Sequence, residues 1–384
     1  MTQDIQDILR PSCDLLALGE PAHREPAFGW VRNALFVRLV DRGFRSIALE
    51  TDRVAALSVN DFVQGGAGTL DAVMREGFSH GFGGLDANRQ LVAWMRERNQ
   101  DLPPGERLAL HGFDTPTENT SAPSPRPYLE HVRAYLGLDL DLSGPAGADD
   151  RWSSEEAVLD PAMSPGATAG AERLRVIADD MLTALYTRAP ELVAATSRAD
   201  WLRARTHLTA GRGLLRYHRQ AAVPLERSAR MTGLLASRDA LMAQNLLDLR
   251  GEEARRGATL VCAHNLHLRR GTSTMRVADM DTAWAGAGEI VTSLSQEEYA
   301  FVAGSLGRSE ALGLGEPDPD THEGLLGRRV TAWGLVAATE AGPARTRTDT
   351  NPQQGYFPLD QDTLDAADAV LHIGSGTAAV AALS

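Results

Sequence analysis

Apolar runs alternate with stretches of helical periodicity along the first part of the chain. The mostly apolar runs 13–19 and 44–49 have the length of buried strands, and the stretch 25–42 between them places apolar residues at helical spacing. Gly43 ends that predicted helix. A strand, a helix and a second strand in this order predict a parallel, right-handed unit.

The same alternation returns farther along the chain. Helical spacing recurs after Asp52 and over residues 86–99. Further strand-like runs occur at residues 107–113, 258–263, 300–302, 330–337 and 369–373. Strands that alternate with helices in this way predict an α/β fold, with a mostly parallel sheet flanked by helices.

The middle of the chain has a different character. Residues 115–151 are rich in Pro, Gly and Asp, which indicates a loop or linker. Residues 153–237 are rich in Ala, Leu and Arg with helical spacing, and a further helix is predicted over 238–250. We therefore expect an inserted helical subdomain. The predicted organisation is the first part of an α/β core at 1–115, a linker and helical insertion at 116–237, and the second part of the core at 238–384.

Composition and charge narrow the possible functions. The 384 residues carry a formal net charge of −13, which argues against a nucleic acid as partner because its phosphates require concentrated positive charge. The sequence contains no lysine, so all 38 basic residues are arginine. Schiff-base lysines and a phosphate-binding Gly-Lys-Ser/Thr loop are therefore impossible.

The chain shows no signal for secretion or for a membrane. Residues 1–7 carry acids where a signal peptide carries bases, and no apolar run reaches the roughly 18 residues of a transmembrane helix. Cys13 and Cys262 lie inside apolar runs and are expected to be buried hydrophobic residues without a disulfide. We expect a cytoplasmic protein with no membrane partner.

Two short motifs of acids and histidines carry the candidate chemistry. Glu20 and His23 follow the first apolar run, three positions apart, and His264 and His267 follow the run 258–263 with the same spacing. A carboxylate beside an imidazole raises its basicity and fixes its tautomer, as a general base for water requires. The alternative is that Glu20 is only an acid at the start of a helix.

Further polar residues follow neighbouring predicted strands. Glu50, Asp114 and His264 each come at the end of a strand-like run, and open α/β sheets place active sites at these strand ends. We therefore expect them in one pocket with Glu20. The alternative is that Asp114 and Asn265 satisfy backbone groups in turns. His80, in a Gly-flanked loop, either lines this pocket or is exposed.

Other reaction classes fit less well. The histidines and carboxylates suit zinc, iron or manganese, but no His-Glu-x-x-His helix is present, so we expect no cofactor and keep a divalent metal as an alternative. A serine hydrolase is disfavoured because no Gly-x-Ser-x-Gly motif occurs. Ser305 is a near miss that follows a strand-like run, but residues 307–310 resemble a turn more than the helix that should follow such a serine. A dinucleotide-binding glycine motif is also absent.

Several segments together resemble the erythromycin esterase family, whose relatives include succinoglycan-biosynthesis-like proteins. In order along the chain they are Leu18–His23, Arg32, Gly43–Arg45, Ala48–Glu50, Trp94–Asn99, Gly112–Asp114, Ala263–His267 and Asp368–Ile373. The resemblance covers nearly the whole chain. It departs from the family pattern at Ala22, where a hydroxyl residue is common, and at Arg24, which is often glycine.

The resemblance implies an α/β core interrupted by a helical region, with a deep cleft in which family members open a macrolide lactone by adding water. It implies that His23 is the base, with Glu20 and Glu50 tuning the histidines. Arg32 becomes a pocket cation and His264 a second catalytic histidine, the two stabilising the oxyanion or protonating the leaving group. Arg24 places a charge at the cleft mouth.

We therefore expect a metal-independent hydrolase whose partner is a small-molecule ester or lactone. The expected catalytic residues are His23, Glu20, Glu50, His264 and Arg32, and the expected substrate-binding residues are His80, Asp114, Asn265 and His267. The alternatives are an isomerase, cyclase or transesterase of natural-product biosynthesis, a metal-dependent hydrolase, and a binding or sequestering protein. Antibiotic resistance and biosynthesis both remain open as roles, and so does the oligomeric state.

Overall fold

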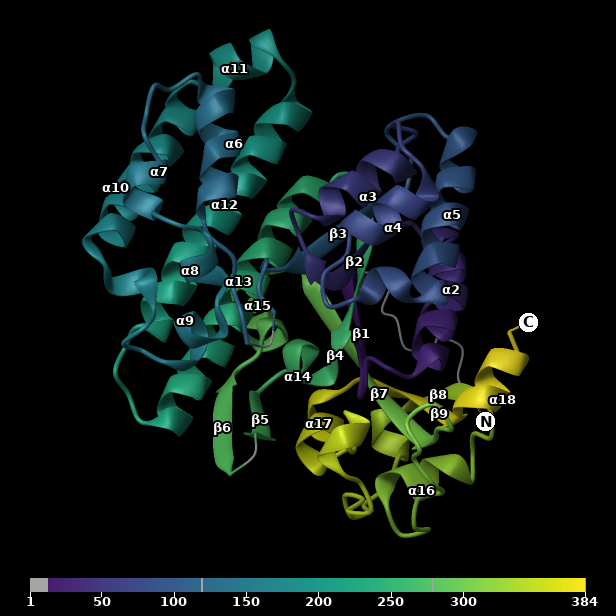
Figure 1. Ribbon diagram of the computed structural model, residues 1–384. Helices are drawn as coiled ribbons and strands as arrows, with labels where there is room; N and C mark the ends of the chain where they lie inside the picture. Colours follow the sequence, from purple (N-terminus) through teal and green to yellow (C-terminus); the bar gives the residue numbers. More distant parts are fainter. Residues whose placement is uncertain (1–12, 119, 278, 384) are drawn as a thin grey trace.

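A seven-stranded sheet forms the centre of the molecule (Figure 1). The computed structural model describes residues 13–118, 120–277 and 279–383; residues 1–12, where no signal peptide is predicted, lie outside them. The strand order is β3-β2-β4-β1-β7-β9-β8, and every neighbouring pair is parallel except β8 with β9. The predicted α/β fold with a mostly parallel sheet is therefore confirmed.

The strands have the following bounds: β1 Cys13–Glu20, β2 Phe44–Asp52, β3 Ala109–Asp114, β4 Ala258–His264, β5 Thr272–Val277, β6 Met280–Ala285, β7 Glu298–Arg308, β8 Trp333–Ala337 and β9 Ala369–Ser375. The helices of the first half are α2 Pro26–Val40, α3 Ala56–Val63, α4 Leu70–Glu76, α5 Asp86–Gln100, α6 Arg126–Leu136, α7 Ser143–Ala146, α8 Asp150–Ser153, α9 Glu155–Leu159 and α10 Ala169–Thr187. Those of the second half are α11 Ala189–Ala195, α12 Arg198–Ala221, α13 Arg227–Glu253, α14 Asn265–Leu268, α15 Ala287–Leu294, α16 His322–Gly327, α17 Gln361–Ala366 and α18 Gly376–Ala381. Short 3-10 helices lie at Phe82–Gly84, Pro165–Ala167, Ala338–Glu340 and Pro352–Gln354.

Both faces of the sheet are buried under helices. Along β1, Leu16 and Leu18 point into a core shared with α2, α3 and α5, whereas Leu15 and Ala17 point into a core shared with α13 and α15. This alternation follows from the two-residue repeat of a strand. It explains why the strands are almost uniformly apolar, as expected for a parallel sheet covered on both sides.

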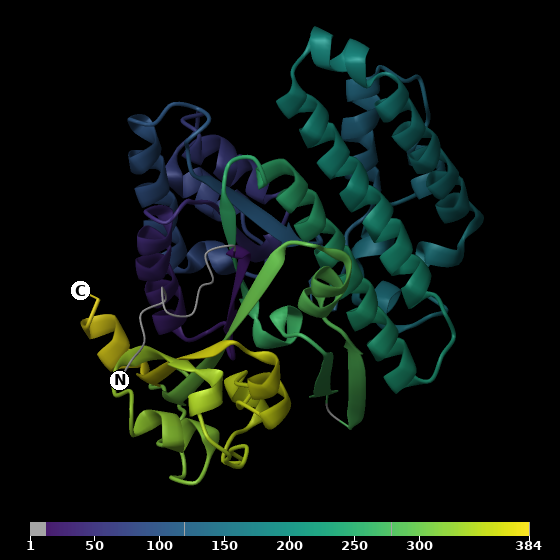
Figure 2. The ribbon, with the colours of Figure 1, turned by 180° about the vertical axis from the view of Figure 1, so that it is seen from behind.

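The helical segment forms a separate layer beside the sheet (Figures 1 and 2). Its main core lies between α6, α10 and α12, with Trp152 and Leu174 fully buried in it. The helix α13 packs against α12 and also contacts β3, so it connects this layer to the sheet. No helix within the described residues is both long and apolar enough to cross a membrane.

Several local predictions were wrong. The segment 115–151 is not only loop, because it contains α6, which begins at Arg126. Pro125 and Pro127 flank this start, where proline is tolerated in the first turn of a helix. The predicted helix 238–250 is the second half of the continuous α13, so residues 237 and 238 lie inside one helix. The sequence reading also missed the hairpin of β5 and β6.

Ser305 lies inside β7, which continues to Arg308, so the turn predicted over residues 307–310 begins later than expected. It is fully buried, and its hydroxyl is 3.0 Å from His372 Nδ1 on the neighbouring β9. The glycines at 304 and 307 remain in the strand because each faces another backbone segment, where a side chain would clash. Ser305 is thus a core residue of the sheet.

Candidate active site

The ends of four adjacent strands bring the predicted acids and histidines together. Glu20, Asp114 and His264 are the last residues of β1, β3 and β4, and Glu50 lies two residues before the end of β2. These strands are neighbours in the order β3-β2-β4-β1, and Glu20 is directly paired with His264. The parallel topology therefore positions the site as the sequence predicts.

His23 is held by Glu20. Its Nδ1 lies 2.8 Å from Glu20 Oε1, so the neutral ring donates its Nδ1 proton to this carboxylate. Its Nε2 lies 3.8 Å from Glu50 Oε1. Burial lowers the pKa of His23, but the negative charges of Glu50 and Glu20 outweigh burial and raise the pKa above its usual value. His23 is thus a stronger base than a free histidine.

Glu50 is the central carboxylate of the site. Its Oε1 is 3.0 Å from Arg238 Nη2 and 3.3 Å from His267 Nε2, and its Oε2 accepts a 2.8 Å hydrogen bond from the main-chain N–H of His264. Burial alone would raise the pKa of Glu50, but His267, His23 and Arg238 hold it well below the usual value. Glu50 is therefore ionised.

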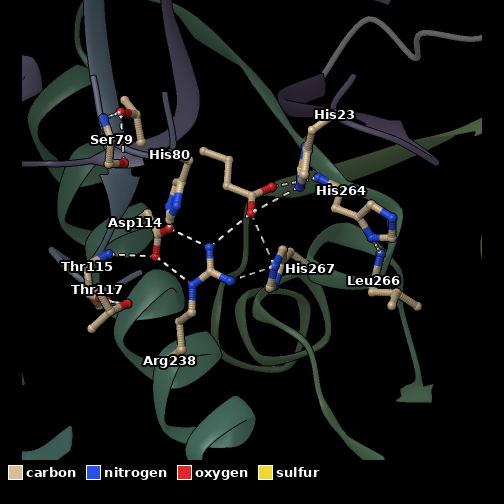
Figure 3. A network of polar contacts seen from close by, with 12 residues as sticks. His23, Ser79, His80, Asp114, Thr115, Thr117, Arg238, His264, Leu266 and His267 are labelled. Atoms are coloured by element: carbon tan, nitrogen blue, oxygen red, sulfur yellow. Dashed lines mark hydrogen bonds and ion pairs between the residues drawn. The ribbon is translucent and has the colours of Figure 1, made fainter. Parts of the chain in front are cut away.

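Arg238 links Glu50 to Asp114 (Figure 3). Its Nε and Nη2 lie 3.1 and 2.5 Å from the two carboxylate oxygens of Asp114, in the forked geometry that arginine and carboxylate prefer. Asp114 is fully buried, and although burial raises its pKa, Arg238 and His80 lower it below the usual value. Asp114 therefore holds Arg238 in place beneath the cavity.

His267 is positioned by a buried acid, Asp239. The Nδ1 of His267 lies 2.8 Å from Asp239 Oδ1, and Asp239 also accepts hydrogen bonds from Trp284 Nε1 and the main-chain N–H of Ala287. Burial lowers the pKa of His267, but Asp239 and Glu50 outweigh it and raise the pKa to about 10. His267 is therefore an imidazolium near neutral pH, with both ring protons engaged.

His264 and Asn265 have mainly local hydrogen bonds. His264 Nδ1 accepts from the main-chain N–H of Leu266 and caps α14, and burial together with the nearby His23 lowers its pKa to about 3. The His264 ring lies edge-on to His23, with 5.5 Å between ring centroids. Asn265 uses both amide atoms to bind the backbone of Gly304, so its side chain fastens the start of α14 to β7.

His80 adopts a left-handed backbone conformation with φ of 57°, which is uncommon for a residue other than glycine. Both ring nitrogens are engaged, Nδ1 at 2.7 Å from Glu118 and Nε2 at 2.9 Å from Asp114. Burial lowers the pKa of His80, but Asp114 and Glu118 raise it above the usual value. These two contacts fix the glycine-rich loop over the site.

The site opens into a cavity of about 800 Å³, which we call the main cavity. Five of the nine predicted site residues line it: His23, Glu50, His80, His264 and His267. Glu20 and Arg32 line a neighbouring smaller cavity, whereas Asp114 and Asn265 line neither. Arg24 lies on the wall of the main cavity.

Sequence reasoning missed Arg238 and Asp239, which lie on α13. Leu235, Asp239, Met242 and Leu246 recur at helical spacing, so Asp239 occupies a core-facing position that is otherwise apolar. An acid on such a stripe was the available signal. Glu118, Phe82, Trp284 and Phe357 also line the main cavity without having been predicted.

No three His, Cys, Asp or Glu side chains come together as a metal-binding group in the part of the chain that the structure describes. Several of the candidate oxygen and nitrogen atoms have protein partners instead: Glu50 and Asp114 bind Arg238, and His267 binds Asp239. The residues present therefore do not match the metal site that we kept as an alternative.

The comparisons with known proteins agree with this geometry. The family model described as erythromycin esterase matches residues 39–378. The chain belongs to the erythromycin esterase family. Membership in this family indicates a hydrolase of the esterase type. Comparison with curated proteins finds none that matches.

Solved structures share the fold of this family member. A protein from Bacillus cereus aligns with a TM-score of 0.69 and 15% identity, covering 97% of this chain and 90% of its own. A succinoglycan biosynthesis protein aligns with a TM-score of 0.65 and 16% identity, with the same coverage. A histidine-to-asparagine mutant of the erythromycin esterase EreC, in its open conformation, aligns with a TM-score of 0.65 and 19% identity over 96% of this chain and 93% of its own.

Proposed function

We propose that the protein hydrolyses an ester or lactone, with His23 as the general base. The observation that carries the proposal is the setting of the His23 ring. Its Nδ1 proton is donated to Glu20, which leaves the Nε2 lone pair at the main cavity, 3.8 Å from the ionised Glu50. Family membership supports hydrolase chemistry at this site.

The proposed reaction begins with a water molecule between His23 and Glu50. His23 Nε2 and Glu50 Oε1 can each accept a hydrogen bond from one water molecule, so the two residues orient the lone pair of that water toward a bound ester carbonyl. As water attacks the carbonyl carbon, its proton passes to His23 Nε2. The tetrahedral intermediate then expels the alkoxide, and His23 donates the proton that it received from water to this alkoxide. The products are a carboxylic acid and an alcohol.

Glu50 stabilises the imidazolium that forms on His23, because its negative charge lies beside that ring. In this proposal Arg238 and His267 keep Glu50 ionised, and Glu20 fixes the tautomer of His23. His264 acts as a positioning residue, since its main-chain N–H binds Glu50 and its ring packs against His23. Its Nε2 is buried and has no hydrogen-bond partner in the described residues.

The size of the main cavity supports a substantial organic substrate. Small-molecule sites commonly measure about 300–1,000 Å³, and the main cavity lies in the upper part of this range at about 800 Å³. Its walls combine aromatic rings, such as Phe82, Trp284 and Phe357, with charged groups. A macrolide-like lactone or another natural-product ester suits this lining.

The test is incubation with a panel of macrolactones and linear esters, followed by mass spectrometry of the products. Hydrolysis of a macrolactone adds the mass of one water, and hydrolysis of a linear ester gives an acid and an alcohol whose masses sum to ester plus water. An isomerase or cyclase leaves the mass unchanged, and a transesterase adds an alcohol to a lactone or exchanges the alcohol of a linear ester. We expect the mass of one water to be added to at least one substrate, and not by the His23→Asn variant. Rearranged products of unchanged mass would overturn hydrolysis in favour of the biosynthetic alternatives.

A further inference from the structure

A second cavity adjoins the main one across the His23 side chain. This side chamber has a volume of about 270 Å³ and shares four residues with the main cavity: His23, Glu50, Phe82 and Leu85. Its volume is about nine times the ~30 Å³ that a water molecule occupies in the liquid. It therefore has room for an organic fragment and not only for water.

The walls of the side chamber combine apolar and charged side chains, and Arg32 lines it together with the acids Glu20, Glu25, Glu50 and Asp86. Trp30, Leu49 and Phe78 contribute hydrophobic surface. The guanidinium of Arg32 donates to the side-chain oxygens of Asn33 and Asn88, with Nη2 at 2.8 Å from each. Both partners are neutral amides. Glu20 and Glu50 are engaged by His23 and Arg238, and Glu25 caps α2, whereas the hydrogen-bond partners of Arg32 are uncharged.

The two amides hold Arg32 in a fixed orientation. Asn33 Nδ2 donates to the main-chain oxygen of Ala87 at 2.7 Å, and Asn88 Nδ2 donates to that of Phe82 at 2.9 Å. These bonds determine that both amide oxygens face the guanidinium. Arg32 is therefore oriented before any ligand arrives, which reduces the entropy lost on binding.

Arg32 is half-buried and has no counter-ion, unlike three of the fully buried arginines. Arg53, Arg250 and Arg347 each form an ion pair with an acid. No carboxylate in the described residues lies within ion-pair distance of Arg32, and Glu20, which acts on it at longer range, is bound to His23. An enclosed charge without an opposite charge is costly, so this arrangement favours an anionic ligand.

We propose that the side chamber binds a carboxylate group on the acid portion of the substrate, with Arg32 as its anchor. His23 and Glu50 line both cavities, so the ester bond lies between them, with the acid portion in the side chamber and the alcohol portion in the main cavity. The apolar walls contact the carbon chain, and the planar fork of Arg32 matches a carboxylate. The placement of the ester bond rests on the proposed hydrolysis; the binding of a carboxylate does not.

Calorimetric titration with hexanoate and hexanamide tests the carboxylate site directly. The two probes have similar size and shape and differ in charge. We expect the intact protein to bind hexanoate at least about tenfold more tightly than the amide, and Arg32→Gln to abolish this preference. Arg24→Gln, which removes a guanidinium from the main cavity, is the matched control and should preserve it. Equal binding of both probes, or a preference that survives Arg32→Gln, would overturn the proposal.

Crystals of the unmodified protein provide a measurement that does not depend on the folding of a variant. After soaking with 6-bromohexanoate, we expect the carboxylate at Arg32 and the anomalous signal of bromine on the His23 side of the side chamber. Bromine signal only at other places on the protein would contradict the site.

Kinetics with two matched esters identifies where the carboxylate comes from. Monoethyl adipate carries a free carboxylate, and diethyl adipate does not. If the substrate supplies the carboxylate, Arg32→Gln raises KM for the monoester alone. If hydrolysis creates it, the variant weakens inhibition by hexanoate and affects both esters equally. The absence of both effects would refute the site. Failure to hydrolyse any ester would contradict the proposed function but leave the hexanoate titration valid.

Discussion

Glu50 and Arg238 form an ion pair although 188 residues separate them in the sequence, with Arg238 Nη2 3.0 Å from Glu50 Oε1. The same guanidinium binds Asp114, so one side chain of α13 connects the ends of β2 and β3. Two buried acids therefore share one cation. The ionised state of the central carboxylate therefore depends on α13, a helix that begins within the helical insertion.

Replacement of Arg238 should destabilise the fold strongly. Arg238→Met leaves Glu50 and Asp114 buried without their cation, and breaking a buried pair in this way costs about 3–5 kcal/mol. Chemical denaturation followed by circular dichroism measures the change in the free energy of unfolding. Arg219→Met is the control, because its ion pair with Glu172 is exposed and should contribute about 1 kcal/mol or less. Equal losses in the two variants would contradict the role of Arg238.

Replacement of His23 should abolish most of the activity while the fold is retained. General-base catalysis contributes roughly 100-fold to 10,000-fold, so His23→Ala should lower kcat by about that factor. Because His23 is one-third exposed, its truncation leaves no large core void. Steady-state kinetics on a hydrolysed ester, with circular dichroism as the folding control, makes the comparison. A folded variant with near-normal kcat would show that His23 is not the base.

The pH dependence of kcat/KM should reveal the influence of Glu20 on His23. A general base works when deprotonated, so activity should rise with pH through the pKa of His23, which lies above its usual value. Glu20→Gln removes a negative charge and lowers that pKa, so the acidic limb should move to lower pH. Glu118→Gln acts on His80 and should leave the limb in place. An unmoved limb in Glu20→Gln would contradict the pairing.

The sequence was sufficient for the catalytic strand ends because parallel strands must align their carboxyl ends. Each of four polar residues follows an apolar run, and the parallel order of neighbouring strands brings them to the same edge of the sheet: Glu20, Glu50, Asp114 and His264. Arg238 and Asp239 could not be placed in the same way. Helical spacing places Asp239 on a core-facing stripe, but the strand ends that α13 reaches depend on how this helix packs across β3, which is a long-range relationship.

The same limit explains the outcome for Asn265 and Arg32. Both stand in or near the motifs, but spacing alone does not determine which way a side chain points. Asn265 turns toward the backbone of Gly304, and Arg32 turns toward Asn33 and Asn88 on the side-chamber wall. Hydrogen-bond partners from distant segments decide these directions.

Asp239 should control the charge of His267. The pKa of His267 is raised to about 10, with Asp239 the foremost of the groups that raise it against burial. The contribution of this pair to the free energy of unfolding is complete below the pKa of His267 in the unfolded chain, and it is lost as pH rises toward 10. Nitrogen-15 NMR of the imidazole should find His267 protonated at pH values near 8. In Asp239→Asn the ring should lose its proton at lower pH, whereas Asp179→Asn, at an exposed acid, should change nothing.

Removal of divalent metals should leave the hydrolytic activity intact. A metal ion bound by Glu50, Asp114 or His267 would have to displace Arg238 from the two acids, or Asp239 from His267, and each of these buried groups would lose its partner. Treatment with EDTA or 1,10-phenanthroline, and elemental analysis of protein purified without a metal-affinity step, make the measurement. Loss of activity that stoichiometric zinc, iron or manganese restores would contradict the metal-independent mechanism and make His23, His264 and the neighbouring acids the candidate ligands.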